Sequence, residues 1–138
     1  MEDPDDENSE NLQSVGTDVA QVDQAQKGMI SRKDMQRIQT ELMFTDPNLT
    51  LNSLANKLET NRTYLSQAIH HYFHTNLSGL IKDMRIEYVL RILDKSDPND
   101  VNIQKIAADA GYLYMSTFYR DFNKVAGCTP KQYMQTNH

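Results

Sequence analysis

Two short clusters of polar side chains hold the residues of this sequence that are best suited to chemistry. The first is Arg62, Thr63, Ser66 and Gln67, and the second is Met115, Ser116, Tyr119 and Arg120. Arginine can donate two hydrogen bonds to guanine O6 and N7, glutamine pairs with adenine N6 and N7, and hydroxyls reach either base. These residue types therefore favour hydrogen bonding to base edges. The alternative is that both clusters are ordinary solvated polar surfaces, and Arg120 could instead pair with Asp121 or with a nearby carboxylate.

The first cluster lies at the start of the second helix of a predicted helix-turn-helix. Thr50 is placed to cap one helix and Asn61 to cap the next, and only Glu59 and Thr60 separate them. Helical spacing of apolar residues gives each helix an inward face. These faces are Leu51, Leu54, Ala55 and Leu58 in the first helix, and Leu65, Ala68, Ile69 and Tyr72 in the second. The first cluster then occupies outward positions.

The second cluster lies in a repeat of the same pattern. A shift of 52 residues takes the first inward face onto Ile103, Ile106, Ala107 and Ala110, and a shift of 53 takes Leu65 and Ile69 onto Phe118 and Phe122. Gly111 suits the positive φ of a tight turn, whereas Glu59 stands there in the first copy and weakens its turn pattern. An ordinary solvated surface could explain one such polar cluster, but it explains two copies of the same pattern less well.

Two further helices are predicted around these copies. Ser31 and Asp34 have the spacing of a capping box, and Asp46-Pro47 stops the helix that follows, with its apolar stripe at Met35, Ile38, Leu42 and Met43. Between the copies, Asn76 caps a linking helix from Leu77 to Leu93, about 25 Å long at 1.5 Å per residue. Its apolar residues are Leu77, Leu80, Ile81, Met84, Tyr88, Leu90 and Leu93. We expect this helix to act as a rigid spacer.

The charge of the chain is divided unevenly. Residues 1–27 hold eight carboxylates against Lys27, a net charge of −7, and the remainder holds 13 Lys and Arg against 11 Asp and Glu, a net charge of +2. The total of −5 therefore misdescribes the folded part. We expect residues 1–28 to be a disordered acidic tail or linker, which could compete with phosphate, and residues 29–138 to form the folded domain. No apolar run is long enough to span a membrane.

An enzymatic or metal-dependent role has little support. The best candidates are His70, His71 and His74, of which His70 and His74 are spaced to share a helix face and could ligate zinc, but no Cys or acidic third ligand is near them in the sequence. We expect no metal, no cofactor and no catalysis.

The span from Asp34 to Gln135 resembles the DNA-binding domain of the AraC-type (AraC/XylS family) transcriptional regulators. The resemblance is most specific in "IAADAGY", "FYRDF" and "GCTPKQY", in which Gly127 ends a helix, Thr129 caps the next, Pro130 begins it and Tyr133 packs back. The chain departs from the family pattern at three positions. A capping residue is absent at Tyr114, and a basic residue is absent at Asn123 and at Met134.

The resemblance implies an all-α fold of about seven helices, with two helix-turn-helix subdomains joined by the linking helix. It implies sequence-specific binding of double-stranded promoter or operator DNA, with two recognition helices in successive major grooves. The family's base-contacting positions fall on every residue of the two clusters except Arg62. We add Arg62 because the helical pattern gives it an outward position. Phosphate contacts are expected from Asn61, Lys82, Arg85, Lys124 and Thr129.

The resemblance also implies a bacterial transcription factor in the cytoplasm, with RNA polymerase as a partner. Family members commonly carry a sensor, dimerisation or membrane-anchored portion, and we expect this chain to be part of a longer regulator. The competing interpretation is a helical protein-interaction module that does not bind DNA.

Overall fold

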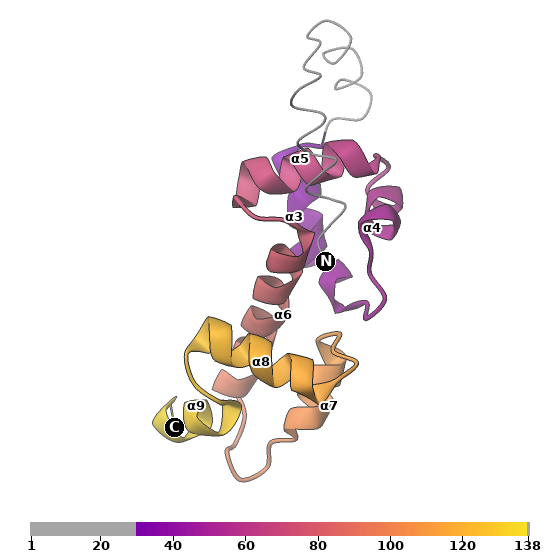
Figure 1. Ribbon diagram of the computed structural model, residues 1–138. Helices are drawn as coiled ribbons and strands as arrows, with labels where there is room; N and C mark the ends of the chain where they lie inside the picture. The colour runs from indigo at the N-terminus through magenta and orange to yellow at the C-terminus, as the bar shows by residue number, and fades with distance from the viewer. Residues whose placement is uncertain (1–29, 138) are drawn as a thin grey trace, which may run out of the picture. The chain divides into compact units, whose positions relative to one another are not determined.

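The computed structural model describes residues 30–137, and every regular element within them is a helix (Figure 1). Seven α-helices and one short 3-10 helix are present in this span, which confirms the all-α prediction. None of these helices is both long enough and apolar enough to cross a membrane. The predicted acidic tail, residues 1–28, lies outside the described residues.

The described chain forms two compact units. One consists of residues 30–43 and 49–80, and the other of residues 44–48 and 81–137. The linking helix α6, Leu77–Asp94, contributes its first turn to one unit and the rest to the other. Asn76 caps it as predicted, because the Asn76 side chain accepts from the Gly79 amide at 3.0 Å.

The first unit contains α3, α4 and α5, and its helix starts follow the predicted caps. Ser31 and Asp34 form a reciprocal capping box, with the Asp34 amide 3.1 Å from Ser31 Oγ. Thr50 caps α4 through the Ser53 amide at 3.0 Å, and α5 packs on both α3 and α4. The bounds are Arg32–Thr40 for α3, Leu51–Lys57 for α4 and Arg62–Phe73 for α5.

The end of α3 differs from the prediction. The apolar stripe was expected to continue through Leu42, but the helix ends at Thr40 and Leu42 adopts a φ of 56° with 45% of its surface exposed. A residue in this left-handed conformation turns the chain out of the helix. Met43 is buried after the turn, in the 3-10 helix η1, Met43–Thr45.

The turns of the two helix-turn-helix motifs have the same hydrogen bonds. In the first, the Glu59 amide donates to Asn56 O and the Thr60 amide to Ala55 O, at 3.1 and 2.9 Å. In the second, the amides of Gly111 and Tyr112 donate to the carbonyls of Ala108 and Ala107, both at 3.0 Å. The weak turn pattern at Glu59 was misleading, since Glu59 adopts a φ of 58° and Gly111 a φ of 110°.

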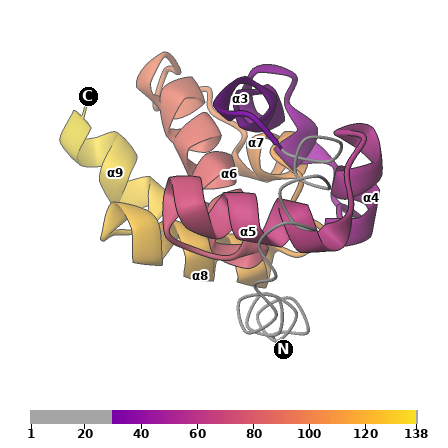
Figure 2. The same ribbon diagram turned by 90° about the horizontal axis from the view of Figure 1, so that it is seen from above.

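The second unit consists of most of α6 together with α7, α8 and α9, around an aromatic core. Phe118 and Phe122 are fully buried, and Tyr112 and Tyr133 pack against them with ring centroids 5.4 and 6.0 Å away. Figure 2 shows α9 beside the end of α8, which it contacts. The bounds are Ile103–Asp109 for α7, Met115–Ala126 for α8 and Pro130–Asn137 for α9.

Arg85 joins the segment before Pro47 to this core. Its Nε donates to Phe44 O at 2.8 Å and its Nη2 to Asp46 O at 2.9 Å. A Cβ at Gly111 would lie 2.8 Å from Thr45 O and 2.9 Å from Arg85 Nε, so this turn can approach only because Gly111 has no side chain.

The C-terminal helix begins as its sequence predicts. Gly127 ends α8 with a φ of 79°, and Thr129 caps α9 by accepting from the Gln132 amide at 3.1 Å. Pro130 is the first residue of α9. Tyr133 packs back through its hydroxyl, which donates to Asp94 Oδ1 at 2.6 Å.

Candidate nucleic-acid interface

The candidate interface of the first unit is built on the first two turns of α5. Asn61 caps the helix by accepting from the Tyr64 amide at 2.9 Å, which fixes where the helix begins. Arg62, Thr63 and Gln67 are half-buried and keep part of their surface accessible. Thr63 and Gln67 share a face because Thr63 lies one turn before Gln67, whereas Arg62 lies five residues before Gln67 and extends beside α4.

Ser66 does not lie where the outward pattern put it. Only 8% of its surface is exposed, and it shares the buried face of α5 with Leu65 and Ile69. Ser66 stands one turn before Ile69, so the apolar face reaches it. Its expected outward position is therefore wrong, because a small side chain here is covered by the packing around it.

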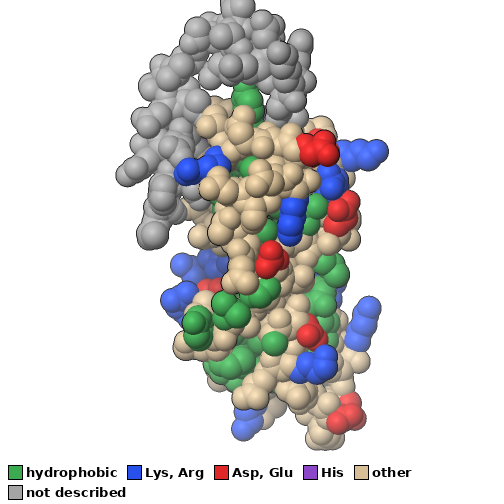
Figure 3. Space-filling view, turned by 90° about the vertical axis from the view of Figure 1, so that its right-hand side faces the viewer, with side chains coloured by type: hydrophobic (Ala, Val, Ile, Leu, Met, Phe, Trp, Pro, Cys, Tyr) green, Lys and Arg blue, Asp and Glu red, His purple; other side chains and the backbone are tan. Residues whose placement is uncertain are grey.

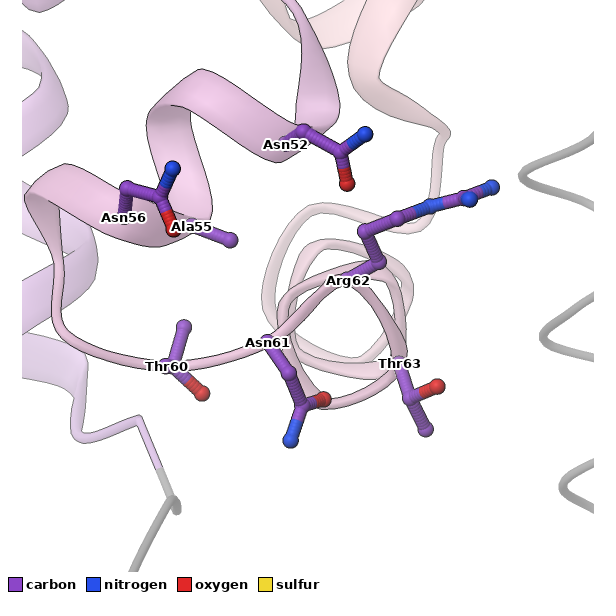
Figure 4. A pocket seen from close by; sticks show the side chains of 7 residues that line it. All are labelled: Asn52, Ala55, Asn56, Thr60, Asn61, Arg62 and Thr63. Atoms are coloured by element: carbon purple, nitrogen blue, oxygen red, sulfur yellow. The ribbon is translucent and has the colours of Figure 1, made fainter.

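A polar recess lies between α4 and the start of α5, with a volume of about 390 Å³. Figure 4 shows Asn52 and Asn56 projecting from α4, Arg62 extending on the side of Asn52, and Asn61 and Thr63 pointing the other way. No carboxylate is among its lining residues, and Arg62 supplies the charge. Amides, hydroxyls and a guanidinium are the donors that bind a phosphate group. Sequence reasoning missed Asn52 and Asn56, although both follow from the outward face of α4.

The candidate interface of the second unit lies at the equivalent positions of α8. Met115 is half-buried and Ser116 is exposed, and 46% of the Tyr119 surface is exposed. A shift of 53 residues takes Ser66 onto Tyr119, so a buried small residue in one unit corresponds to a projecting aromatic ring in the other. The first turn of α8 also lacks a side-chain cap, since Tyr114 makes no capping hydrogen bond.

Arg120 is available at the surface of α8 although it has a carboxylate neighbour. Its Nε lies 3.6 Å from Asp121 Oδ1, and 74% of its side chain is exposed. The pair is long, and only its Asp121 partner is shielded, with 14% of that side chain exposed. Asp121 also accepts a hydrogen bond from the Tyr112 hydroxyl at 2.9 Å. The ion pair considered as the alternative role of Arg120 exists, and it leaves most of the guanidinium accessible.

The residues expected to contact phosphate fall into two groups. Asn61, Lys124 and Thr129 are exposed, and Lys82 is half-buried, so their polar groups can reach a ligand. Arg85 differs because its guanidinium donates to two backbone carbonyls and its guanidinium carbon lies 5.5 Å from the Tyr112 ring centroid. Burial lowers the pKa of Arg85 from its usual value. The Arg85 guanidinium therefore holds the fold of its own unit.

Figure 3 draws one face of the molecule, on which Lys and Arg side chains and Asp and Glu side chains are both present. The space-filling view agrees with the small net charge of +2 outside the first 27 residues.

Comparison with known families agrees with this geometry. A family described as "Helix-turn-helix domain" matches residues 54–136, which run from within α4 to the end of α9. The chain belongs to the AraC-type helix-turn-helix family. This family consists of DNA-binding transcription regulators and not of enzymes, and the two helix-turn-helix units confirm the fold and the class of function that the sequence predicted.

Relatives of this AraC-type domain include regulators of known name. The melibiose operon regulatory protein of Escherichia coli K12 is 32% identical over 88 residues, which are 64% of this chain and 28% of that protein. The chain thus spans little more than a quarter of that relative's length.

Solved structures of the same type superpose on the chain. The C-terminal domain of AraT, a response regulator from Geobacillus stearothermophilus, matches with a TM-score of 0.65 and 27% identity, covering 79% of this chain and 88% of that one. The C-terminal domain of the two-component response regulator yesN from Fusobacterium nucleatum matches with a TM-score of 0.62 and 26% identity, covering 74% and 98%.

In the described part of this AraC-type domain, the histidines are His70, His71 and His74, and they lie at the far end of α5. His74 is the C-terminal cap residue of that helix, with a φ of 58°. Within residues 30–137, no group of three His, Cys, Asp or Glu side chains is placed to hold a metal ion.

Proposed function

We propose that the chain binds double-stranded DNA in a sequence-specific manner, with α5 and α8 each entering a major groove. The observation that carries this proposal is the matching of the two turns, Glu59–Thr60 and Gly111–Tyr112, hydrogen bond for hydrogen bond. After each matched turn the chain enters the second helix, directly at the N-cap residue Asn61 in the first copy and after one further residue, Leu113, in the second. In a helix-turn-helix, the first residues of the second helix are the ones that reach base edges.

Within each unit, the proposed base contacts follow from exposure and chemistry. Arg120 and Gln67 are the residues suited to guanine and adenine, respectively. Thr63 and Ser116 are equivalent hydroxyls one turn earlier, and Met115 and Tyr119 offer apolar contact to a thymine methyl. Arg62 lines the recess beside Asn52 and can serve either a base or a phosphate. Ser66 contributes less, since most of its surface is covered.

Phosphate contacts are proposed from both units. In the first unit, the proposed phosphate-binding groups are Asn61 and the polar recess, which lie at the N-terminus of α5, where the helix dipole favours an anion. Lys82, Lys124 and Thr129 remain candidates elsewhere. Arg85 is left out of this set, because its hydrogen bonds are made to Phe44 and Asp46.

We propose further that the domain works as part of a longer regulator in the bacterial cytoplasm. The melibiose operon relative is a regulatory protein more than three times as long as the matched stretch, and the solved relatives are C-terminal domains of response regulators. A sensor or receiver portion, and RNA polymerase as a partner at the promoter, are the corresponding proposals for this protein.

Selection of bound duplexes from a genomic fragment library tests the proposal. The result expected is a motif with two half-sites whose centres lie about one helical turn, roughly 34 Å, apart. A parallel selection with a chain that begins at Gly28 reports on competition by the acidic residues before it. If neither chain enriches a motif nor shows salt-dependent binding, the competing interpretation of a protein-interaction module is favoured.

A further inference from the structure

The second unit contains a recess beside the candidate interface, and two of its lining residues, Tyr119 and Thr129, are also proposed DNA contacts. It lies where the loop before α7 faces the end of α8 and the start of α9, and its volume is about 570 Å³. This volume is within the range of small-molecule sites, about 300 to 1,000 Å³. The lining residues are Pro98, Asn99, Val101, Ile103, Tyr119, Asn123, Thr129, Pro130, Lys131, Met134 and Gln135.

The walls of this recess are mainly apolar and come from the loop before α7, the first residue of α7, and helices α8 and α9. Val101 and Ile103 line one side and are half-buried, Tyr119 comes from α8, and Pro130 and Met134 from α9 are buried. Polar groups are few, and three of them are the side-chain amides of Asn99, Asn123 and Gln135. Mostly apolar walls with a few placed polar groups are typical of sites for small organic ligands.

The charge of the lining is positive. Lys131 is the single charged residue among those that line the recess, and no Asp or Glu is among them. Two carboxylates are next to lining residues in the loop before α7. Asp97 accepts the amide of Asn99 at 2.9 Å within its own turn, and Asp100 is exposed between Asn99 and Val101. An apolar ligand in the recess would therefore meet one ammonium group and no opposing lining carboxylate.

We infer that this recess binds a small apolar anion, such as an aromatic carboxylate or sulfonate. The ring system would lie against Val101, Ile103 and Tyr119, and the acid group would pair with Lys131. Besides Lys131, the hydrogen-bond donors of the lining are the side-chain amides of Asn99, Asn123 and Gln135 and the hydroxyls of Tyr119 and Thr129.

The same ligand would oppose DNA binding through Tyr119. Tyr119 lines the recess and is also a proposed base-contact residue of α8, so a ligand that packs on its ring restricts the side chain that the major groove would receive. This second step rests on the proposed function, whereas occupation of the recess does not. Occupation of the recess and its effect on DNA binding are therefore measured separately.

Occupation is tested on the full chain without DNA, with anilinonaphthalene sulfonate as the fluorescent aromatic anion. Lys131→Gln is expected to raise its Kd about threefold through the lost charge. Asn123→Trp, which fills the recess from an exposed position on α8, is expected to weaken binding by roughly tenfold or more. Lys95→Gln is the matched control, because Lys95 is an exposed lysine of the same unit that does not line the recess. Equal Kd values for wild type, Lys131→Gln and Asn123→Trp would overturn the inference.

Coupling is tested by adding the dye to a preformed complex with a selected duplex. The expected result is a rise in the apparent Kd for DNA that Asn123→Trp abolishes and Lys95→Gln preserves. Dye binding that follows the variants but leaves DNA affinity unchanged would overturn the coupling step alone. Absence of DNA binding in every variant would count against the proposed function, and the dye titration would still decide the occupation of the recess.

Discussion

The guanidinium of Arg85 lies over the ring of Tyr112, with its carbon 5.5 Å from the ring centroid. At this distance a cation over an aromatic face is attracted by the ring. Tyr112 in turn donates its hydroxyl to Asp121, and Arg85 donates to the carbonyls of Phe44 and Asp46. This chain of contacts joins α6, the turn of the second helix-turn-helix and α8, so the position of α8 depends on it.

Replacing Arg85 should therefore destabilise the fold. Arg85→Ala removes two hydrogen bonds to part-buried carbonyls and is expected to cost about 2 to 3 kcal/mol of unfolding free energy. Urea unfolding followed by circular dichroism measures this. Arg91→Ala, at an exposed position of the same helix, is expected to change stability by about 0.5 kcal/mol or less. Equal midpoints for the two variants would show that the contacts of Arg85 do not hold the unit.

The two glycines with positive φ should respond differently to alanine. A Cβ at Gly127 would have no atom within 4 Å, so Gly127→Ala should lose only the conformational free energy of a φ of 79°, roughly 1 to 2 kcal/mol. Gly111→Ala has a similar conformational cost and also places a Cβ 2.8 Å from Thr45 O. Its loss of unfolding free energy should therefore be larger by about 1 kcal/mol or more. Thermal unfolding of both variants compares them. A smaller loss for Gly111→Ala would mean that segment 44–48 is free to move away.

The start of α8 offers a stabilising substitution. Tyr114 stands at the N-cap position without a capping hydrogen bond, and Tyr114→Ser would supply one to an amide of the first turn. The expected gain in unfolding free energy is about 1 kcal/mol. Asn61→Ala, which removes the cap of α5, is the matched variant and should lose a similar amount. A loss of stability for Tyr114→Ser would indicate that the tyrosine ring itself is needed.

Tyr133 should make stability fall at alkaline pH. Its hydrogen bond to Asp94 raises the pKa of Tyr133 to about 12, whereas an unfolded tyrosine has a pKa of about 10. A raised folded pKa means that the contribution is fully present below pH 10 and is lost as pH rises from about 10 to 12. Melting temperatures across this window should fall less steeply for Tyr133→Phe than for wild type. Parallel curves would argue against the contact with Asp94.

Local features of the fold could be predicted from the sequence because their causes are local. The caps at Ser31, Thr50, Asn61 and Thr129 each satisfy an amide three residues further on, so residue type and spacing suffice to identify them. The repeat of the apolar faces likewise identified the two helix-turn-helix motifs.

Features that depend on distant partners could not be predicted in this way. Arg85 looked like a phosphate ligand because its carbonyl partners lie 39 and 41 residues away in the sequence. Ser66 looked exposed because periodicity marks apolar residues and gives no sign of a small polar side chain that neighbours cover. Ile86 and Val89 of α6 were left out of its predicted apolar stripe, although both are fully buried, because that helix is covered on more than one side.

Base-preference profiles of Gln67→Ala and Arg120→Ala against wild type test the central claim most directly. Each variant should lose about 1 to 3 kcal/mol and relax preference at one base pair, and the two positions should lie about 10 base pairs apart. Lys124→Ala is the comparison variant, expected to weaken all duplexes alike. Uniform losses for Gln67→Ala and Arg120→Ala, with no base pair relaxed by either, would contradict reading of DNA by α5 and α8.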